Sequence, residues 1–110
     1  MEHLDYDTLN TLKQLMEDDF ALLIDTFVQD STDRISTLRQ VIQGTDADLI
    51  RRAAHSFKGS SSNIGALQLS ALCSALEKKA LEKRLEALDV DLDSIEKEFA
   101  QVQVLLRSLS

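Results

Sequence analysis

The chain has 110 residues, enough for one domain with a single core, and its lack of proline and wealth of helix-favouring residues indicate an all-helical fold. A net charge of −7 argues against a protein that binds nucleic acid or an anionic membrane surface. There is no apolar run long enough to span a membrane and no signal peptide, and the single cysteine suits a reducing compartment, so we expect a cytoplasmic protein.

A short first helix is expected over residues 6–16, because apolar residues recur there every three or four positions. Its apolar positions are Leu9, Leu12 and Met16. Asp5 is a suitable N-cap, and Leu4 is placed to pack against Leu9 as a hydrophobic staple.

A long second helix is expected to begin at the acidic run 17–19, because negative charge is favourable at the positive end of the helix dipole. Its apolar stripe consists of Phe20, Leu23, Ile24, Phe27, Val28, Ser31, Ile35, Leu38 and Ile42. Gly44 should end this helix in the left-handed conformation that glycine adopts readily. Thr45 then begins the third helix, with Asp48 three positions later in an arrangement close to a capping box.

The third helix is expected to end near Gly65, which suits a C-cap or a tight turn. One face of this helix carries Leu49 or Ile50, then Ala53, Ala54, Phe57, Ser61 and Ile64. A fourth helix is expected over residues 67–82, a loop within 83–90, and a fifth helix capped by Asp89 or Asp91. The stripes of these two helices are Leu69, Leu72, Cys73, Leu76 and Ala80, then Leu92, Ile95, Phe99, Val102, Leu106 and Leu109. We therefore predict an antiparallel four-helix bundle with a short additional N-terminal helix as a lid, forming a single domain over the whole chain.

Residues 55–65 are the most informative segment, because one of two histidines and one of three glycines lie there four positions apart. Gly59 lies in the middle of a predicted helix, where glycine costs about 1 kcal/mol relative to alanine. We interpret it as a place where another molecule approaches the backbone. Residues three and four apart share a helix face. The residues expected on the outward face around the histidine are Arg51, Arg52, His55, Lys58, Gly59 and Ser62.

The stretch from Leu49 to Leu76 contains no aspartate or glutamate and carries +3, which leaves −10 for the rest of a chain whose net charge is −7. Chance combined with a packed interior is one interpretation. The other is a basic patch that favours an anionic group near His55.

The surroundings of His55 fit phosphoryl chemistry better than other uses of histidine. A zinc site needs three or four ligands, whereas the chain offers two histidines and one cysteine, and His3 is close to an end expected to fray. A nucleophilic triad needs a carboxylate to orient the imidazole, and no acid lies within six residues of His55. A neutral imidazole favoured by neighbouring cations is a good nucleophile toward phosphorus, and Lys58 could pair with the resulting phosphoryl group. Cys73 lies on an apolar stripe and is expected to be buried and unreactive.

The signature of histidine-containing phosphotransfer (HPt) domains resembles the pattern His55-x-x-Lys58-Gly59-x-Ser61-x-x-Ile64-Gly65. The order of the predicted helices resembles that family over essentially the whole chain. The resemblance implies a phosphorelay intermediate, not an enzyme: His55 accepts a phosphoryl group from a receiver-domain aspartate of a hybrid sensor kinase and passes it to a response regulator. Lys58 would steady the phosphoryl group and Gly59 would give steric access. The receiver would bring Mg²⁺ and the acidic residues, so no cofactor or metal site is expected in this chain.

The resemblance also implies that receivers dock on the motif helix and its neighbour. The docking candidates are Met16, Val28, Ser31, Arg51, Arg52 and Ser62. Two further hypotheses are a structural adaptor, in which His55 is incidental, and a receiver-binding protein with a regulatory role. No Walker-type phosphate-binding loop is present, so phosphorylation from ATP is not expected. We expect a monomer that is a stand-alone bacterial protein, with a module of a larger kinase as the alternative.

Overall fold

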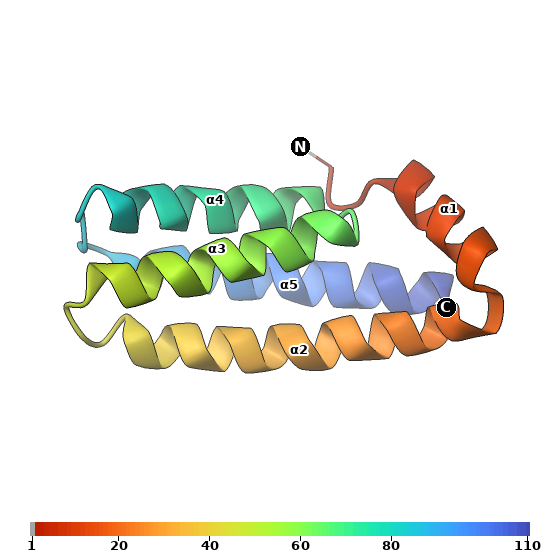
Figure 1. Cartoon of the computed structure of the whole chain (residues 1–110), viewed down its shortest axis with the longest axis horizontal. Coiled ribbons are helices and arrows are strands. Elements are labelled where there is room, and N and C mark those ends of the chain that lie inside the picture. Colours follow the sequence, from red (N-terminus) through yellow and green to blue (C-terminus); the bar gives the residue numbers. More distant parts are fainter. Residues whose placement is uncertain (1) are drawn as a thin grey trace.

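The structure is a computed structural model that describes residues 2–110, and it consists of helices packed side by side (Figure 1). The elements are α1 (Tyr6–Met16), a short 3₁₀ turn η1 (Glu17–Asp19), α2 (Phe20–Val41), α3 (Ala47–Asn63), α4 (Leu67–Leu81) and α5 (Leu88–Leu109). Helices α2, α3, α4 and α5 form an elongated bundle in which α3, α4 and α5 each run antiparallel to the helix before them, while α1 crosses one end (Figure 1). The prediction of an all-helical antiparallel bundle with an additional N-terminal helix is confirmed.

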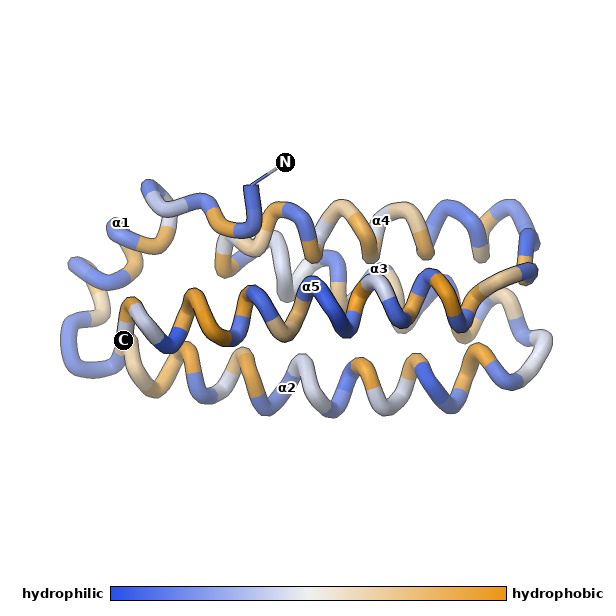
Figure 2. Tube along the Cα trace, turned by 180° about the vertical axis from the view of Figure 1, so that it is seen from behind, coloured by the Kyte–Doolittle hydropathy of each residue, from blue (hydrophilic) through white to orange (hydrophobic). Residues whose placement is uncertain are grey.

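The core of the bundle is formed by one stripe of apolar side chains on each long helix. In Figure 2 these stripes appear as apolar positions that recur along every helix. α3 and α4 are the most closely associated pair. They bury several small side chains, namely Ala54 and Ser61 on α3 and Cys73 and Ala80 on α4. Small residues let two helix backbones approach closely, which fixes the position of α4 beside the outward face of α3. The predicted burial of Cys73 is confirmed, and burial raises the pKa of its thiol to about 12.

α1 begins as its sequence predicts. The Asp5 carboxylate accepts hydrogen bonds from the backbone N–H and the hydroxyl of Thr8, which lower the pKa of Asp5. Leu4 and Leu9 are both fully buried, as a hydrophobic staple requires.

The segment before α1 is attached to the rest of the bundle at three points. The Asp5 N–H donates to the Gly65 carbonyl at 2.8 Å, and the Leu67 N–H donates to the His3 carbonyl at 3.1 Å. The His3 imidazole also lies 2.6 Å from the Glu98 carboxylate on α5. The expectation that His3 lies in a frayed end is therefore wrong. Gly65 has a φ of +80°, so the predicted tight turn after α3 is confirmed.

Two predicted helix ends near residues 42–46 are wrong in detail. Gly44 does not have a positive φ, and its N–H instead donates to the Val41 carbonyl in a simple turn. Asp46, not Thr45, caps α3, because its carboxylate accepts hydrogen bonds from the backbone N–H groups of Asp48 and Leu49.

The start of α5 also differs from the prediction. Ala87 precedes the helix in the left-handed conformation, with a φ of 56°, and α5 begins at Leu88. Asp89 and Asp91 therefore lie within the first turn, where their charge still complements the helix dipole. Within residues 2–110, no helix is both long and apolar enough to cross a membrane.

Candidate functional site

His55 lies on α3 with its side chain 62% exposed, as the helical spacing predicts. Its Nδ1 atom lies 2.5 Å from the Oε2 atom of Glu77 on α4. An ionised carboxylate only accepts hydrogen bonds, so Nδ1 must carry the proton in this contact. In the neutral ring the lone pair then resides on Nε2. The pair presents an oriented imidazole with its other nitrogen available as a nucleophile.

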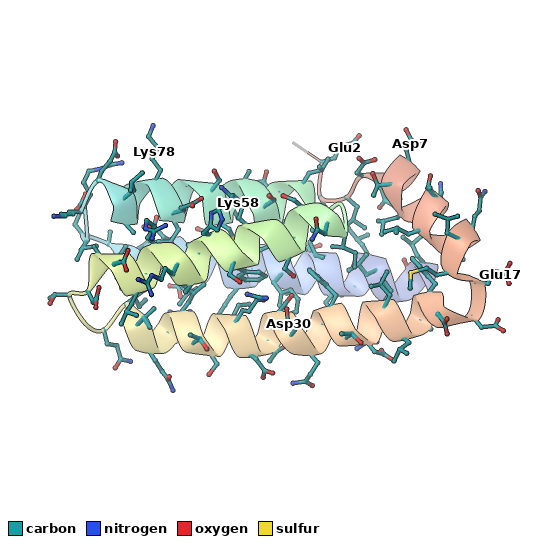
Figure 3. All side chains as sticks on the ribbon, in the orientation of Figure 1. Glu2, Asp7, Glu17, Asp30, Lys58 and Lys78 are labelled. Carbon is teal, nitrogen blue, oxygen red and sulfur yellow. The ribbon has the colours of Figure 1, made fainter. Side chains whose placement is uncertain are left out.

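Glu77 also connects His55 to Lys58. The Lys58 ammonium donates to Oε1 of Glu77 at 2.6 Å, so the two carboxylate oxygens are shared between the lysine and the histidine. Figure 3 shows Lys58 on the side of α3 that faces α4. The hydrogen bond from Lys58 lowers the pKa of Glu77 below its ordinary value of 4.5, burial opposes this effect, and the hydrogen bond from His55 lowers the pKa further. Glu77 is thus held as a carboxylate at neutral pH.

Glu77 is not apparent from the sequence motif, because it is 22 residues from His55 along the chain. Only the packing of α4 against α3 brings the two together. The one available signal was the position of Glu77 directly after the buried Leu76, at the edge of the α4 stripe. The prediction that no carboxylate orients His55 is therefore wrong, because Glu77 reaches the imidazole from the neighbouring helix.

The cations of the expected basic patch pair with the acids at the two ends of the acid-free stretch, which leaves one net positive charge. The Arg51 and Arg52 guanidinium groups pair with the Asp48 carboxylate at 2.9 and 2.8 Å. The hydrogen bond from Arg51 is the largest cause that lowers the pKa of Asp48. Lys58 is paired with Glu77. The cations around His55 are therefore all paired with acids, Arg51 and Arg52 with an acid three and four residues away on the same chain segment and Lys58 with an acid on α4.

Gly59 lies one turn beyond His55 and has open space around it. A Cβ atom built on this glycine would have no heavy atom within 4 Å, outside its own helix backbone and chain neighbours. The glycine is therefore not required by internal packing. Ser62, one turn further on, is exposed, and its hydroxyl lies 2.6 Å from that of Ser70 on α4.

A groove of about 620 Å³ lies on the other side of Gly59, between α1, α2 and α3. Its apolar lining consists of Leu12, Met16, Leu23, Phe27 and Ile64. α3 contributes small or short side chains to it, namely Ser56, Gly59, Ser60 and Asn63. Gly59 thus lies between the His55–Glu77 pair and the apolar groove, and it has no side chain to fill the space there.

The docking candidates divide between the surface and the core. Met16 lines the groove, and Arg52 and Ser62 are exposed. Val28 and Ser31 are 7% and 0% exposed, so neither contributes to a docking surface and that prediction is wrong for both. Both belong to the apolar stripe of α2, and this position buries them.

Comparisons with known proteins identify the family of this chain. The family model described as "Hpt domain" matches residues 22–105. The crystal structure of histidine-containing phosphotransfer protein B (HptB) from Pseudomonas aeruginosa PAO1 has a TM-score of 0.92 and 42% identity over 96% of this chain and 92% of that chain. The maize histidine-containing phosphotransfer protein ZmHP2 has a TM-score of 0.84 over 97% of this chain and 88% of its own, and at 22% identity it shows the shared fold alone. No protein with curated annotation matches. With the family model covering most of its length, the chain belongs to the Hpt domain family.

Proposed function

We propose that His55 is the phosphoacceptor of this histidine phosphotransfer protein. In this proposal it takes the phosphoryl group from a receiver-domain aspartate of a hybrid sensor kinase and passes it to the receiver of a response regulator. The observation that supports His55 most directly is its exposed imidazole, whose Nδ1 is held by Glu77 at 2.5 Å while Nε2 has no hydrogen-bond partner among residues 2–110. The other histidine, His3, lies at the N-terminal segment and uses its Nδ1 in a contact with Glu98.

The proposed reaction needs only the free nitrogen and its orientation. The Nε2 lone pair attacks phosphorus, the N–P bond forms, and the bond from phosphorus to the aspartate oxygen breaks, which returns the aspartate as a carboxylate. The ring then bears positive charge with its proton on Nδ1, and the adjacent Glu77 carboxylate stabilises this charge. The reverse sequence onto a second receiver restores the neutral imidazole.

Lys58 is the residue that we propose to steady the phosphoryl group. Its ammonium is 2.6 Å from Glu77 in the unphosphorylated protein and lies one helical turn from His55. A lysine on a flexible stem can exchange a carboxylate partner for a phosphoryl oxygen nearby. Mg²⁺ and the remaining acidic groups come from the receiver in this proposal.

We further propose that the receiver approaches across Gly59, with part of its surface in the groove and its aspartate over His55. The groove and the His55–Glu77 pair lie on opposite sides of this glycine. The space above Gly59 is open. A side chain at this position would fill that space and obstruct a receiver that contacts both the groove and His55.

The experiment is transfer from phosphorylated receiver domains in the presence of Mg²⁺, followed as acid-labile, base-stable phosphate on the wild type, His55→Gln and His3→Gln. We expect label on the wild type and on His3→Gln, and none on His55→Gln. Because His55 is exposed, the free energy of unfolding of His55→Gln should lie within about 0.5 kcal/mol of that of the wild type. Label retained on His55→Gln would refute the assignment. If the wild type is folded and none of a broad panel of receivers labels it, that result would favour the adaptor hypothesis.

A further inference from the structure

Arg34 on α2 reaches the segment of α3 that carries His55. Its Nη1 atom donates to the Ser56 hydroxyl at 2.5 Å, and Ser56 directly follows His55 in the chain. Consecutive residues differ by about 100° around a helix, so Arg34 approaches from the α2 side of α3, whereas Glu77 approaches His55 from α4. His55 therefore has a cation on each side, Lys58 beside α4 and Arg34 beside α2.

The Arg34 guanidinium is held in place by two groups and still has donors to offer. Its Nε atom donates to the Asp30 carboxylate at 2.7 Å, and Figure 3 shows Asp30 on the side of α2 that faces α3. An arginine has five N–H donors, and Nη2 has no hydrogen-bond partner within residues 2–110. The side chain is 30% exposed, so a group at the surface can reach it. A guanidinium fixed in this way is preorganised to bind an oxygen anion.

The charges beside His55 determine which groups can face a phosphoryl group there. Arg34 and Lys58 carry two positive charges, and their partners Asp30 and Glu77 carry two negative charges. A phosphoryl group adds a charge of about −2. Because the four resident groups sum to zero, this dianion is favoured only if the cations turn toward it and the carboxylates lie behind them. Lys58 alone offers one positive charge to this dianion, which leaves a place for a second cation.

We propose, resting on the function proposed above, that Arg34 is a second phosphoryl-binding residue of the site. When His55 is phosphorylated, Nη2 and Nη1 of Arg34 donate to phosphoryl oxygens, and Nη1 releases the Ser56 hydroxyl. Asp30 continues to accept from Nε, so the guanidinium stays oriented. Lys58 and Arg34 then hold the phosphoryl group from the α4 and α2 sides. This second contact stabilises the phosphohistidine relative to the aspartyl phosphate of the receiver.

A phosphoryl donor that needs no receiver tests the contact directly. With phosphoramidate, Nε2 attacks phosphorus, the N–P bond of the donor breaks and ammonia leaves. The ¹H–¹⁵N signals of the arginine side chains are compared before and after this labelling. Arg39 is the internal control, because it lies on the same helix, is 34% exposed and bonds to Asp93 and Glu96 on α5. We expect the Arg34 signals to shift on phosphorylation and the Arg39 signals to stay in place.

The second measurement is the equilibrium constant for phosphoryl exchange between this chain and a receiver domain that labels it. Arg34→Gln should shift this constant about three- to fivefold toward the receiver, and Arg39→Gln should leave it near the wild-type value. Arg34→Lys should give an intermediate value, because lysine keeps the charge but lacks the planar fork. Urea unfolding checks that the three variants are folded.

Two results would overturn this inference and leave the role of His55 intact. One is a set of Arg34 signals that do not move when His55 is phosphorylated. The other is an equal change of the equilibrium constant in Arg34→Gln and Arg39→Gln. If phosphoramidate and receivers instead label His55→Gln as strongly as the wild type, the proposed function itself is wrong, and this inference with it.

Discussion

Glu77 is the residue that turns an exposed histidine into an oriented one. Its carboxylate fixes the proton on Nδ1 of His55 and is in turn fixed by Lys58. At metal sites, groups that orient a ligating histidine in this way commonly change affinity or activity by 10- to 100-fold when removed. We therefore assign Glu77 a positioning role.

Replacement of Glu77 by alanine should lower the transfer rate at saturating receiver about tenfold or more, because both ring nitrogens then share the proton. Glu77→Gln should retain most of the orientation, since its amide oxygen can still accept from Nδ1. The rate is measured by rapid quench, and ¹⁵N NMR of the imidazole reports the tautomer. Wild-type rates in Glu77→Ala together with an unchanged tautomer would remove this role.

The same carboxylate should make stability depend on pH. The pKa of Glu77 is lowered in the folded protein, chiefly by the hydrogen bond from Lys58. A lowered folded-state pKa stabilises the fold above the ordinary value of 4.5, and this contribution is lost as pH falls through the folded-state value. Urea unfolding of the wild type and of Glu77→Gln should therefore differ by a constant amount above about pH 5.5 and converge below about pH 4.5. A difference that stays constant down to pH 3 would contradict this linkage.

At the scale of the helix, the two glycines of the motif have opposite reasons to be glycine. Gly59 lies within α3 with open space around it, so Gly59→Ala should raise the free energy of unfolding by up to about 1 kcal/mol. Gly65 has a φ of +80°, and an added Cβ would lie 3.2 Å from the Cβ of Asp5. Gly65→Ala should therefore lower that free energy by about 1–2 kcal/mol or more.

Urea denaturation of both variants checks this pair, with transfer assays alongside. The larger change Gly59→Gln should keep the stability gained over glycine but impede transfer, because its side chain occupies the approach to His55. Normal transfer by Gly59→Gln would remove the steric argument. Equal stability changes in the two alanine variants would contradict the assignment of Gly65 to the left-handed turn.

Helix positions were readable from the sequence where one local signal dominates. α1 begins and ends at Tyr6 and Met16 as predicted, because Asp5 is a strong N-cap beside a clear apolar pattern. The ends between α2 and α3 were not, since Thr45 and Asp46 are adjacent residues that can both cap a helix. Aspartate is the stronger N-cap of the two, so the capping-box spacing of Thr45 and Asp48 was given more weight than a local preference that already favoured Asp46.

At the scale of the whole molecule, the site is assembled by contacts that no single segment specifies. The motif located His55, Lys58 and Gly59 correctly on an outward face, because helical spacing determines it. It could not reveal Glu77, whose contact depends on the register between α3 and α4. The groove was likewise hidden, because its walls come from three helices, and only Met16 among its apolar residues was proposed in advance.

The contacts of His3 and Asp5 with the bundle, which we call the N-terminal clasp, should couple the stability of the bundle to the shape of this groove. Glu98 is 8% exposed, and in residues 2–110 His3 is its only side-chain hydrogen-bond partner, so His3→Ala leaves a nearly buried carboxylate without that bond. We expect a loss of about 1–3 kcal/mol in the free energy of unfolding and faster hydrogen exchange at the Asp5 amide, which bonds to Gly65. Lys13→Ala is the control, because it breaks a contact between α1 and the end of α5 that is exposed to solvent, and it should cost about 0.5 kcal/mol or less. Because α1 forms a wall of the groove, His3→Ala should also weaken receiver binding while leaving the transfer rate at saturation unchanged. Equal hydrogen-exchange protection of the Asp5 amide in His3→Ala and Lys13→Ala would show that the clasp does not hold α1 in place.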